Sequence, residues 1–167
     1  AKAILDQLAD AGCMFLLLTG GEPLLRPDFE EIYRHAKRKG MILSLFTNGT
    51  LMTRRIADFL AEYRPHLIEI TLYGATRETY ERVTGVPGSY DRCMRGIDLA
   101  LDRGLRLNLK SVLLKANRHD LAAMKAFAER LGVSYRFDGV LWPRLDGDQC
   151  ALAQRLSPEE VVALDRE

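Results

Sequence analysis

A polar turn follows a short apolar segment near the start of the chain. Residues 14–18 are apolar, and they lead directly into Thr19-Gly20-Gly21-Glu22-Pro23. A short apolar run closed by two glycines predicts a buried strand that ends in a tight turn. Adjacent glycines let a ligand approach the backbone closely, because no Cβ stands in the way. The Glu22 carboxylate adds a hydrogen-bond acceptor, so this turn is a candidate ligand site at a strand end.

Three later apolar segments carry polar residues close to where they end: Asn48 in a Thr-Asn-Gly turn, the pair Thr71 and Tyr73, and the pair Asn108 and Lys110. Residues two apart on a strand point to the same side, so each pair shares a face. A lysine within an apolar strand is costly unless it is paired, which suggests that Lys110 contacts an anionic group. Because parallel strands end on one side of a sheet, we expect these residues to converge with Glu22 on one concave surface.

Each of these features also has a purely structural explanation. Asparagine and glycine tolerate positive φ, so the turn at Asn48 could be simple turn chemistry. Thr71 and Tyr73 could fill the interior of a barrel, and the face with Asn108 and Lys110 could be solvated.

The apolar segments alternate with amphipathic ones, which predicts βαβ units and a parallel sheet. Ser89 and Asn117 are predicted N-caps, with Asp120 completing a capping box after Asn117. A serine followed by Pro158 opens the last helix. This pattern does not choose between a doubly wound sheet and a barrel. The expected strands cover residues 14–19, 41–46, 67–72, 105–114 and 133–137, and the expected helices residues 1–12, 27–39, 53–63, 77–83, 89–103, 117–132 and 158 onward, with a loop over 138–154.

Composition narrows the classes of function. The 167 residues carry 24 basic and 23 acidic side chains, a net charge of +1. That balance argues against a dedicated nucleic-acid or membrane-surface protein. No apolar run approaches the roughly 18 residues of a membrane span. Three scattered cysteines favour a reducing compartment, so we expect a cytoplasmic protein. The histidines His35, His66 and His119 lack metal-ligand spacing and are predicted surface residues.

In their order and spacing, the Gly-Gly-Glu-Pro turn, the Thr-Asn-Gly turn, residues 70–74 and the stretch Thr-Gly-Val-Pro-Gly-Ser-Tyr over residues 84–90 resemble the radical S-adenosylmethionine (radical SAM) superfamily. The likeness is greatest to members with a SPASM domain, such as peptide-modifying and sulfatase maturases. It implies an α/β fold, a partial (β/α)6 barrel with a parallel sheet and helices outside, in which the first strand and the cluster loop are absent. This barrel would cover residues 1–156, and residues 157–167 would begin a C-terminal helix leading out of the domain.

The resemblance also implies roles for single residues. The turn at Gly20, Gly21 and Glu22 would bind the amino group of S-adenosylmethionine, and Asn48 would lie beside this cofactor. Thr71 stands where relatives have a serine near the methionyl carboxylate. Tyr73 replaces the aspartate of many SPASM enzymes, which suggests a different substrate contact. With Asn108 and Lys110 these residues make up the predicted cofactor site.

The cysteine signature of the family is missing. The motif C-x-x-x-C-x-x-C holds a [4Fe–4S] cluster through thiolates, whereas the cysteines here are Cys13, Cys93 and Cys150. The simplest interpretation is a fragment that begins after the cluster loop, and the rarer one is a homologue that lost the cluster. We therefore expect the cluster only in a full-length protein, and we predict neither catalytic residues nor metal ligands in this chain.

The resemblance implies a radical SAM oxidoreductase or maturase that generates a 5′-deoxyadenosyl radical to modify a peptide or protein, with no nucleic-acid or membrane partner. The fragment alone would be inactive. The alternative is a non-enzymatic or degenerate α/β ligand-binding domain without a cluster. A third interpretation, an iron-free TIM-barrel-type metabolic enzyme, lacks a recognisable acid/base pair.

The cysteine spacing leads to a first prediction. We expect the 167-residue chain to fail to hold a [4Fe–4S] cluster, because its three cysteines are dispersed. Anaerobic reconstitution with iron and sulfide, followed by iron counting and absorption spectra, checks this. A stoichiometric cluster would contradict it.

Overall fold

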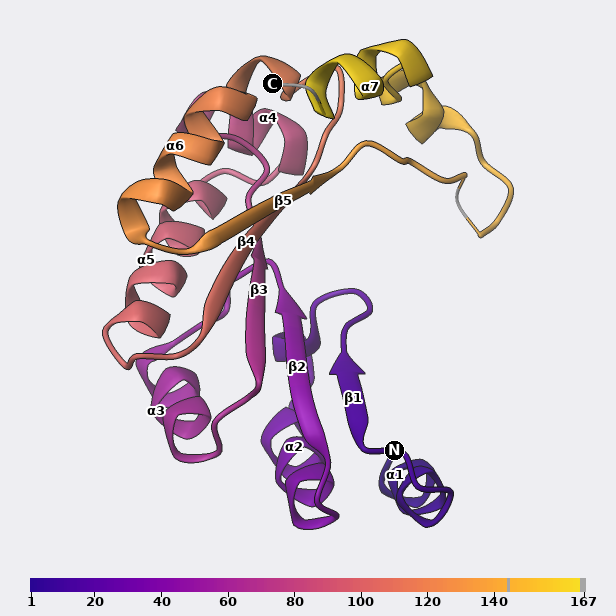
Figure 1. Ribbon diagram of the computed structural model, residues 1–167, viewed down its shortest axis with the longest axis vertical. Helices are drawn as coiled ribbons and strands as arrows, with labels where there is room; N and C mark the ends of the chain where they lie inside the picture. Colours follow the sequence, from indigo (N-terminus) through magenta and orange to yellow (C-terminus); the bar gives the residue numbers. More distant parts are fainter. Residues whose placement is uncertain (144, 166–167) are drawn as a thin grey trace. The chain divides into compact units, whose positions relative to one another are not determined.

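The computed structural model describes residues 1–143 and 145–165. Five strands form one sheet in the order β1-β2-β3-β4-β5, and β2 pairs in parallel with both β1 and β3 (Figure 1). The strands are β1 (Phe15–Leu18), β2 (Ile42–Thr47), β3 (Leu67–Thr71), β4 (Leu107–Val112) and β5 (Ser134–Asp138). The helices are α1 (Lys2–Asp10), α2 (Phe29–Arg38), α3 (Arg54–Glu62), α4 (Arg77–Thr84), α5 (Ser89–Leu101), α6 (Leu121–Leu131) and α7 (Pro158–Asp165), with short 3₁₀ helices at Pro23–Leu25, Arg118–Asp120 and Cys150–Gln154.

The chain divides into two compact units. The first comprises Ala1–Thr71 and Asp91–Asn108, and the second comprises Leu72–Tyr90 and Leu109–Glu167. The first unit thus holds strands β1 to β3, and the second holds α4, α6 and β5. None of the described helices combines the length and apolar character needed to cross a membrane.

Strands β2 and β3 form the core of the first unit. Leu43 and Leu45 alternate along β2 and are fully buried, as are Ile68 and Ile70 on β3. On β2 this period of two is that of a strand with one face packed against helices, whereas on β3 all of residues 68–71 are buried. From α2, the buried Tyr33 donates its hydroxyl to the Tyr63 carbonyl oxygen at 2.9 Å. Burial raises the pKa of this phenol.

Helices α1 and α2 lie side by side and are joined by charged pairs (Figure 1). The Asp6 carboxylate lies 2.8 Å from both Lys39 Nζ and His35 Nε2. Hydrogen bonds from Lys39 and then His35 lower the pKa of Asp6. His35 is half-buried in this charged cluster and is not the freely solvated side chain that the sequence predicted.

Helix α5 approaches the turn after β2 very closely. A Cβ added at Gly96 would lie 2.2 Å from the Gly49 carbonyl oxygen. Gly49 itself has φ +74°, and a Cβ there would lie 3.1 Å from a methyl carbon of Ile70. This turn is therefore confined between α5 and β3, and the residues next to Gly49 are held with it.

In the second unit, α6 packs against β5 (Figure 1). The helix ends as predicted at Gly132, whose φ of +68° is the left-handed conformation that glycine adopts readily. Met124 of α6 and Leu113 are fully buried. A loop was expected over residues 138–154. In the structure, Asp138 is the last residue of β5, and Cys150–Gln154 forms a 3₁₀ helix.

Two predicted caps differ from the structure. Ser89 is the first helical residue of α5, and its hydroxyl lies 2.9 Å from the Thr84 hydroxyl oxygen. Asn117 precedes the 3₁₀ helix Arg118–Asp120 but makes no side-chain cap bond. Its amide instead accepts the Leu114 N–H and donates to the Tyr73 and Val112 carbonyl oxygens. Ser89 thus lies one residue inside its helix and contacts a neighbour five residues away. Asn117 keeps the N-cap position, but its amide serves other partners, among them Tyr73, 44 residues away in the chain.

The close approach at Gly96 leads to a prediction about stability. Replacing a helical glycine with alanine normally stabilises a helix by about 0.5–1 kcal/mol. Here we expect Gly96→Ala to lower the free energy of unfolding by about 1–3 kcal/mol, because the new methyl group meets the Gly49 carbonyl. Urea unfolding measures this, with the exposed Asp98→Ala in the same helix as the control. A neutral or stabilising Gly96→Ala would show that the two segments can separate.

Candidate functional site

The Glu22 carboxylate joins the turn after β1 to the turn after β2. Its Oε1 accepts hydrogen bonds from the Thr47 hydroxyl at 2.6 Å and from the Leu24 N–H at 3.1 Å. Its Oε2 accepts the Asn48 N–H at 2.8 Å. Hydrogen bonds to an ionised carboxylate are stronger than those between neutral groups. The two polar turns expected to share a ligand are thus connected directly.

The hydrogen bonds to Glu22 limit how many further bonds its carboxylate can accept from a ligand. A carboxylate offers about four acceptor positions, and groups of the protein occupy three of them at Glu22. Most of its acceptor capacity therefore holds the turns in place. Direct acceptors for a ligand must come mainly from neighbouring groups.

The two glycines before Glu22 are the nearest such groups. Gly20 and Gly21 are exposed, and a Cβ added at either would meet no heavy atom within 4 Å. Gly20 has φ +130°, a conformation that side-chain-bearing residues rarely adopt. Outside helices and strand ladders, no backbone N–H of the described residues donates to either carbonyl. The turn thus presents open backbone acceptors of the kind an ammonium group needs.

The turn after β2 is internally bonded. The buried Thr47 hydroxyl oxygen accepts the Gly49 N–H at 3.1 Å. The Asn48 side-chain oxygen accepts the N–H and the hydroxyl of Thr50, at 2.9 and 2.7 Å. These contacts match the turn-chemistry explanation of the Thr-Asn-Gly sequence. They also fix the orientation of the Asn48 amide beside Glu22.

Strand β3 carries a buried carboxylate that was not among the predicted site residues. Glu69 is 2% exposed and lies two residues before Thr71, itself 8% exposed, so the two share a face of the strand. A charged residue within an otherwise apolar strand was the available signal. The structure thus adds Glu69 to the polar residues of the first unit.

On β4, Asn108 and Lys110 occupy the less buried face, and Leu107 and Leu109 alternate with them in the core. Asn108 falls in the first unit and Lys110 in the second. The structure brings Glu22 and Asn48 together, and the convergence of the other predicted residues with them stays a prediction.

Tyr73 follows β3 and belongs to the second unit. Its ring packs edge-on against Tyr80 of α4, with ring centroids 5.7 Å apart. Its carbonyl oxygen accepts a hydrogen bond from the Asn117 side-chain amide at 3.0 Å. The side chains that hold this segment were not recognised as such from the sequence, because their partners lie some 45 residues away in the chain.

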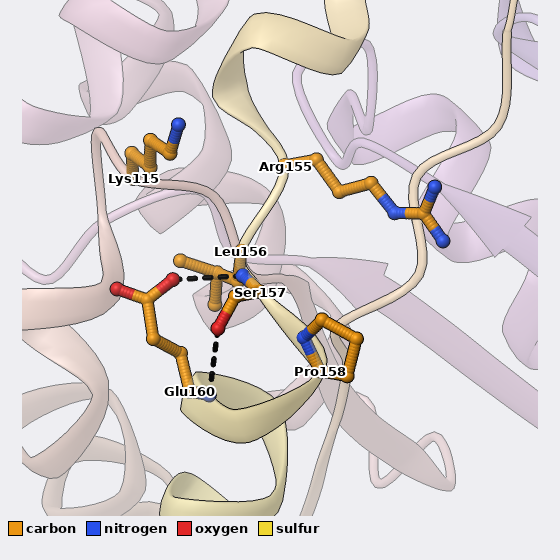
Figure 2. A pocket seen from close by; sticks show the side chains of 6 residues that line it. All are labelled: Lys115, Arg155, Leu156, Ser157, Pro158 and Glu160. Carbon is orange, nitrogen blue, oxygen red and sulfur yellow. Dashed lines mark hydrogen bonds between the residues drawn. The ribbon is translucent and has the colours of Figure 1, made fainter.

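A hollow of about 680 Å³ lies elsewhere in the second unit (Figure 2). The helix start of α7 forms part of its wall, where the Ser157 N–H donates to Glu160 and the Glu160 N–H donates to the Ser157 hydroxyl, at 2.7 and 3.2 Å. The bond to the Ser157 hydroxyl fits the serine predicted to open this helix, and the return bond to Glu160 adds a capping box that was not predicted. No residue of the predicted cofactor site lines the hollow, which is bounded by Lys115, Arg155, Leu156, Ser157, Pro158 and Glu160.

The described residues do not fit a [4Fe–4S] cluster. Across residues 1–143 and 145–165, no group of three or more histidine, cysteine or acidic side chains could hold a metal ion. The thiol of Cys13 contacts the Phe15 carbonyl oxygen at 3.3 Å, and that of Cys150 contacts Asp148 at 3.0 Å. Cys93 is buried in α5. No chemical step can be assigned to a cluster from these side chains.

Comparison with known proteins identifies the family. Residues 1–128 match the radical SAM superfamily. An AdoMet-dependent heme synthase of Methanosarcina barkeri is 32% identical over 149 residues, which cover 89% of this chain and 43% of that protein. A PqqA peptide cyclase of Rhizobium meliloti is 31% identical over 128 residues, covering 77% and 34%. The chain spans less than half the length of these relatives, which are named as enzymes.

Solved structures share the fold. The structure of anSMEcpe with bound AdoMet and Kp18Cys peptide aligns with a TM-score of 0.78 at 19% identity, covering 95% of this chain and 47% of that one. Streptococcus suis SuiB aligns with a TM-score of 0.79 at 15% identity, covering 99% and 38%. These likenesses confirm the predicted α/β fold of a partial radical SAM-type barrel. Taken with the match over residues 1–128, they establish that the chain belongs to the radical SAM superfamily.

Proposed function

We propose that this chain is the S-adenosylmethionine-binding part of a radical SAM enzyme. The observation that carries the proposal is the Glu22 bridge, which fixes the turns after β1 and β2. Beside it lie the Gly20 and Gly21 carbonyls, to which no backbone N–H of the described residues outside helices and strand ladders donates. A methionyl ammonium group donates up to three hydrogen bonds and is satisfied by such acceptors. Relatives named AdoMet-dependent and a similar fold with bound AdoMet support this choice of ligand.

Each remaining residue of the predicted site has a proposed role. The Thr71 hydroxyl would donate to the methionyl carboxylate, and Asn48 would contact the cofactor through its amide. Lys110 would neutralise an anionic group of the cofactor or substrate, with Asn108 on the same strand face. Tyr73 would contact cofactor and substrate. In a full-length enzyme with a [4Fe–4S] cluster, the bound cofactor supplies a 5′-deoxyadenosyl radical.

We propose a peptide or protein as the substrate class, in a maturase-type oxidoreductase of the cytoplasm. The support comes from the PqqA peptide cyclase relative and from two similar folds recorded with peptides, anSMEcpe with Kp18Cys and SuiB with SuiA. A tetrapyrrole is a second candidate, because heme synthases are among the relatives of this chain. The non-enzymatic binding domain remains the alternative in which ligand binding occurs without radical chemistry.

Ligand binding at the glycine turn can be tested by adding side-chain bulk. We expect Gly21→Val to weaken S-adenosylmethionine binding at least tenfold, because a branched side chain would occupy the approach to the carbonyls. Gly21→Ala should weaken it less. Both should keep the wild-type melting temperature, since a Cβ at Gly21 meets no heavy atom within 4 Å. Calorimetric titration beside thermal melts provides the measurement. Unchanged affinity in Gly21→Val, or no binding to the wild-type protein, would refute the proposal.

The Glu22 bridge predicts a combined effect on stability and affinity. We expect Glu22→Ala to lower the free energy of unfolding by about 1.5–3 kcal/mol, because Thr47 and Asn48 lose a charged acceptor. Affinity for S-adenosylmethionine should fall as well, since the turns are released. Urea unfolding and calorimetry measure the two effects. The control is Glu78→Ala, which removes an exposed carboxylate that makes a loose ion pair with Arg82 at 3.8 Å. A Glu22→Ala protein with control-like stability would show that the bridge contributes little.

A further inference from the structure

Three buried side chains hold the segment that leaves β3. The Ser111 hydroxyl donates to the Leu72 carbonyl oxygen at 2.6 Å. The Asn117 side-chain amide donates to the Tyr73 carbonyl oxygen at 3.0 Å. The Asp120 carboxylate accepts the N–H of residue 75 at 2.9 Å. We call Ser111, Asn117 and Asp120 the exit clamp, and all three are at most 8% exposed.

Residues of α4 and α5 also confine the same segment. A Cβ at Gly74 would lie 2.6 Å from the Tyr80 backbone nitrogen. The Tyr90 hydroxyl donates to the Ala75 carbonyl oxygen at 3.2 Å. The Tyr73 ring packs edge-on against Tyr80. Backbone and ring of this short segment are therefore both fixed within the second unit.

Asn117 and Asp120 bind the segment after β3 and do not cap the helices that follow them. Asn117 and Asp120 occupy the N-cap positions of the 3₁₀ helix Arg118–Asp120 and of α6, and neither makes a side-chain cap bond there. A cap of this kind stabilises a helix by about 1 kcal/mol. Both side chains instead bind a segment more than 40 residues away in the chain. Local helix capping therefore does not account for them.

Asn117 suits this position chemically. Its amide oxygen accepts the Leu114 N–H at 2.8 Å, and its amide nitrogen donates to the carbonyl oxygens of Tyr73 and Val112. The residue is fully buried and therefore needs partners for its polar atoms. Only a side chain with one acceptor and two donors satisfies these three groups, and among residues of this size that is asparagine. Its orientation is thereby determined.

We propose that the exit clamp is a positioning device for Tyr73, which sets how this residue meets bound S-adenosylmethionine. The inference rests on the proposed function, because it assumes that Tyr73 belongs to the cofactor site. Binding groups must be held by surrounding residues to act with precision, and fully bonded buried networks provide that rigidity. Ser111, Asn117 and Asp120 act through Tyr73 and do not themselves contact the ligand.

A double-mutant cycle on ligand affinity tests the clamp. We expect Asp120→Ala to weaken S-adenosylmethionine binding about tenfold, the equivalent of one lost hydrogen bond. Asp120→Asn keeps an acceptor for the N–H of residue 75 and should restore affinity to within about twofold. In a Tyr73→Ala background, Asp120→Ala should have little further effect, because the positioned group is gone. Additive losses would overturn the proposal and assign the clamp a general structural role.

Amide hydrogen exchange at Ala75 gives a readout that does not depend on the ligand. We expect exchange about tenfold faster in Asp120→Ala and unchanged in Asp120→Asn. The control is Asp138→Ala, which removes a comparable bond to the Val140 N–H at 2.8 Å. If Asp120→Ala fails to fold, Asn117→Ala replaces it in the test and should accelerate exchange in the same segment. Unchanged exchange in the folded Asp120→Ala protein overturns the clamp. A wild-type protein with protected Ala75 but no affinity for S-adenosylmethionine refutes the proposed function instead.

Discussion

The Glu22 carboxylate is the interaction on which the candidate site depends. The ladder between β1 and β2 ends at the pair Leu18 and Leu45, and beyond this pair other bonds are needed to hold the two segments together. Glu22 supplies them by accepting from the Thr47 hydroxyl and the Asn48 N–H. A carboxylate can do this because its two oxygens accept several donors at once. The open backbone at Gly20 and Gly21 is useful to a ligand only because the turn around it is fixed in this way.

In the second unit, other side chains hold the backbone segment that follows β3. There a hydroxyl, an amide and a carboxylate reach back to the backbone of residues 72–75. In the first unit Thr47 and Asn48 bind the earlier Glu22. In the second unit later side chains bind residues 72–75. In both, the groups beyond a strand end are held by a part of the chain that is distant in sequence. Such loops are rigid without belonging to regular secondary structure, which is the property that a binding surface requires.

These contacts change the roles expected for Gly20, Gly21 and Glu22 in binding the cofactor. The family resemblance assigns Gly20, Gly21 and Glu22 together to the amino group of the cofactor. The hydrogen bonds give Glu22 chiefly a supporting task and leave recognition to the glycine carbonyls. Close packing adds to that support, because α5 reaches the turn at Gly49 only where Gly96 lacks a side chain.

The sequence by itself determined the alternation of strands and helices, the glycine turn and the family. Apolar periodicity and turn residues act locally, and motifs such as Gly-Gly-Glu-Pro are contiguous, so one sequence is enough to find them. Strand limits shifted by one or two residues except at Leu67, since ladders end where partners end. What Glu22, Asn117, Asp120 and Gly96 do was decided only by the tertiary structure. Each meets a group distant in the chain, and Asn117 gives up a local cap for that partner. Local propensity cannot reveal such a choice, because the competing partner is brought near only when the chain folds.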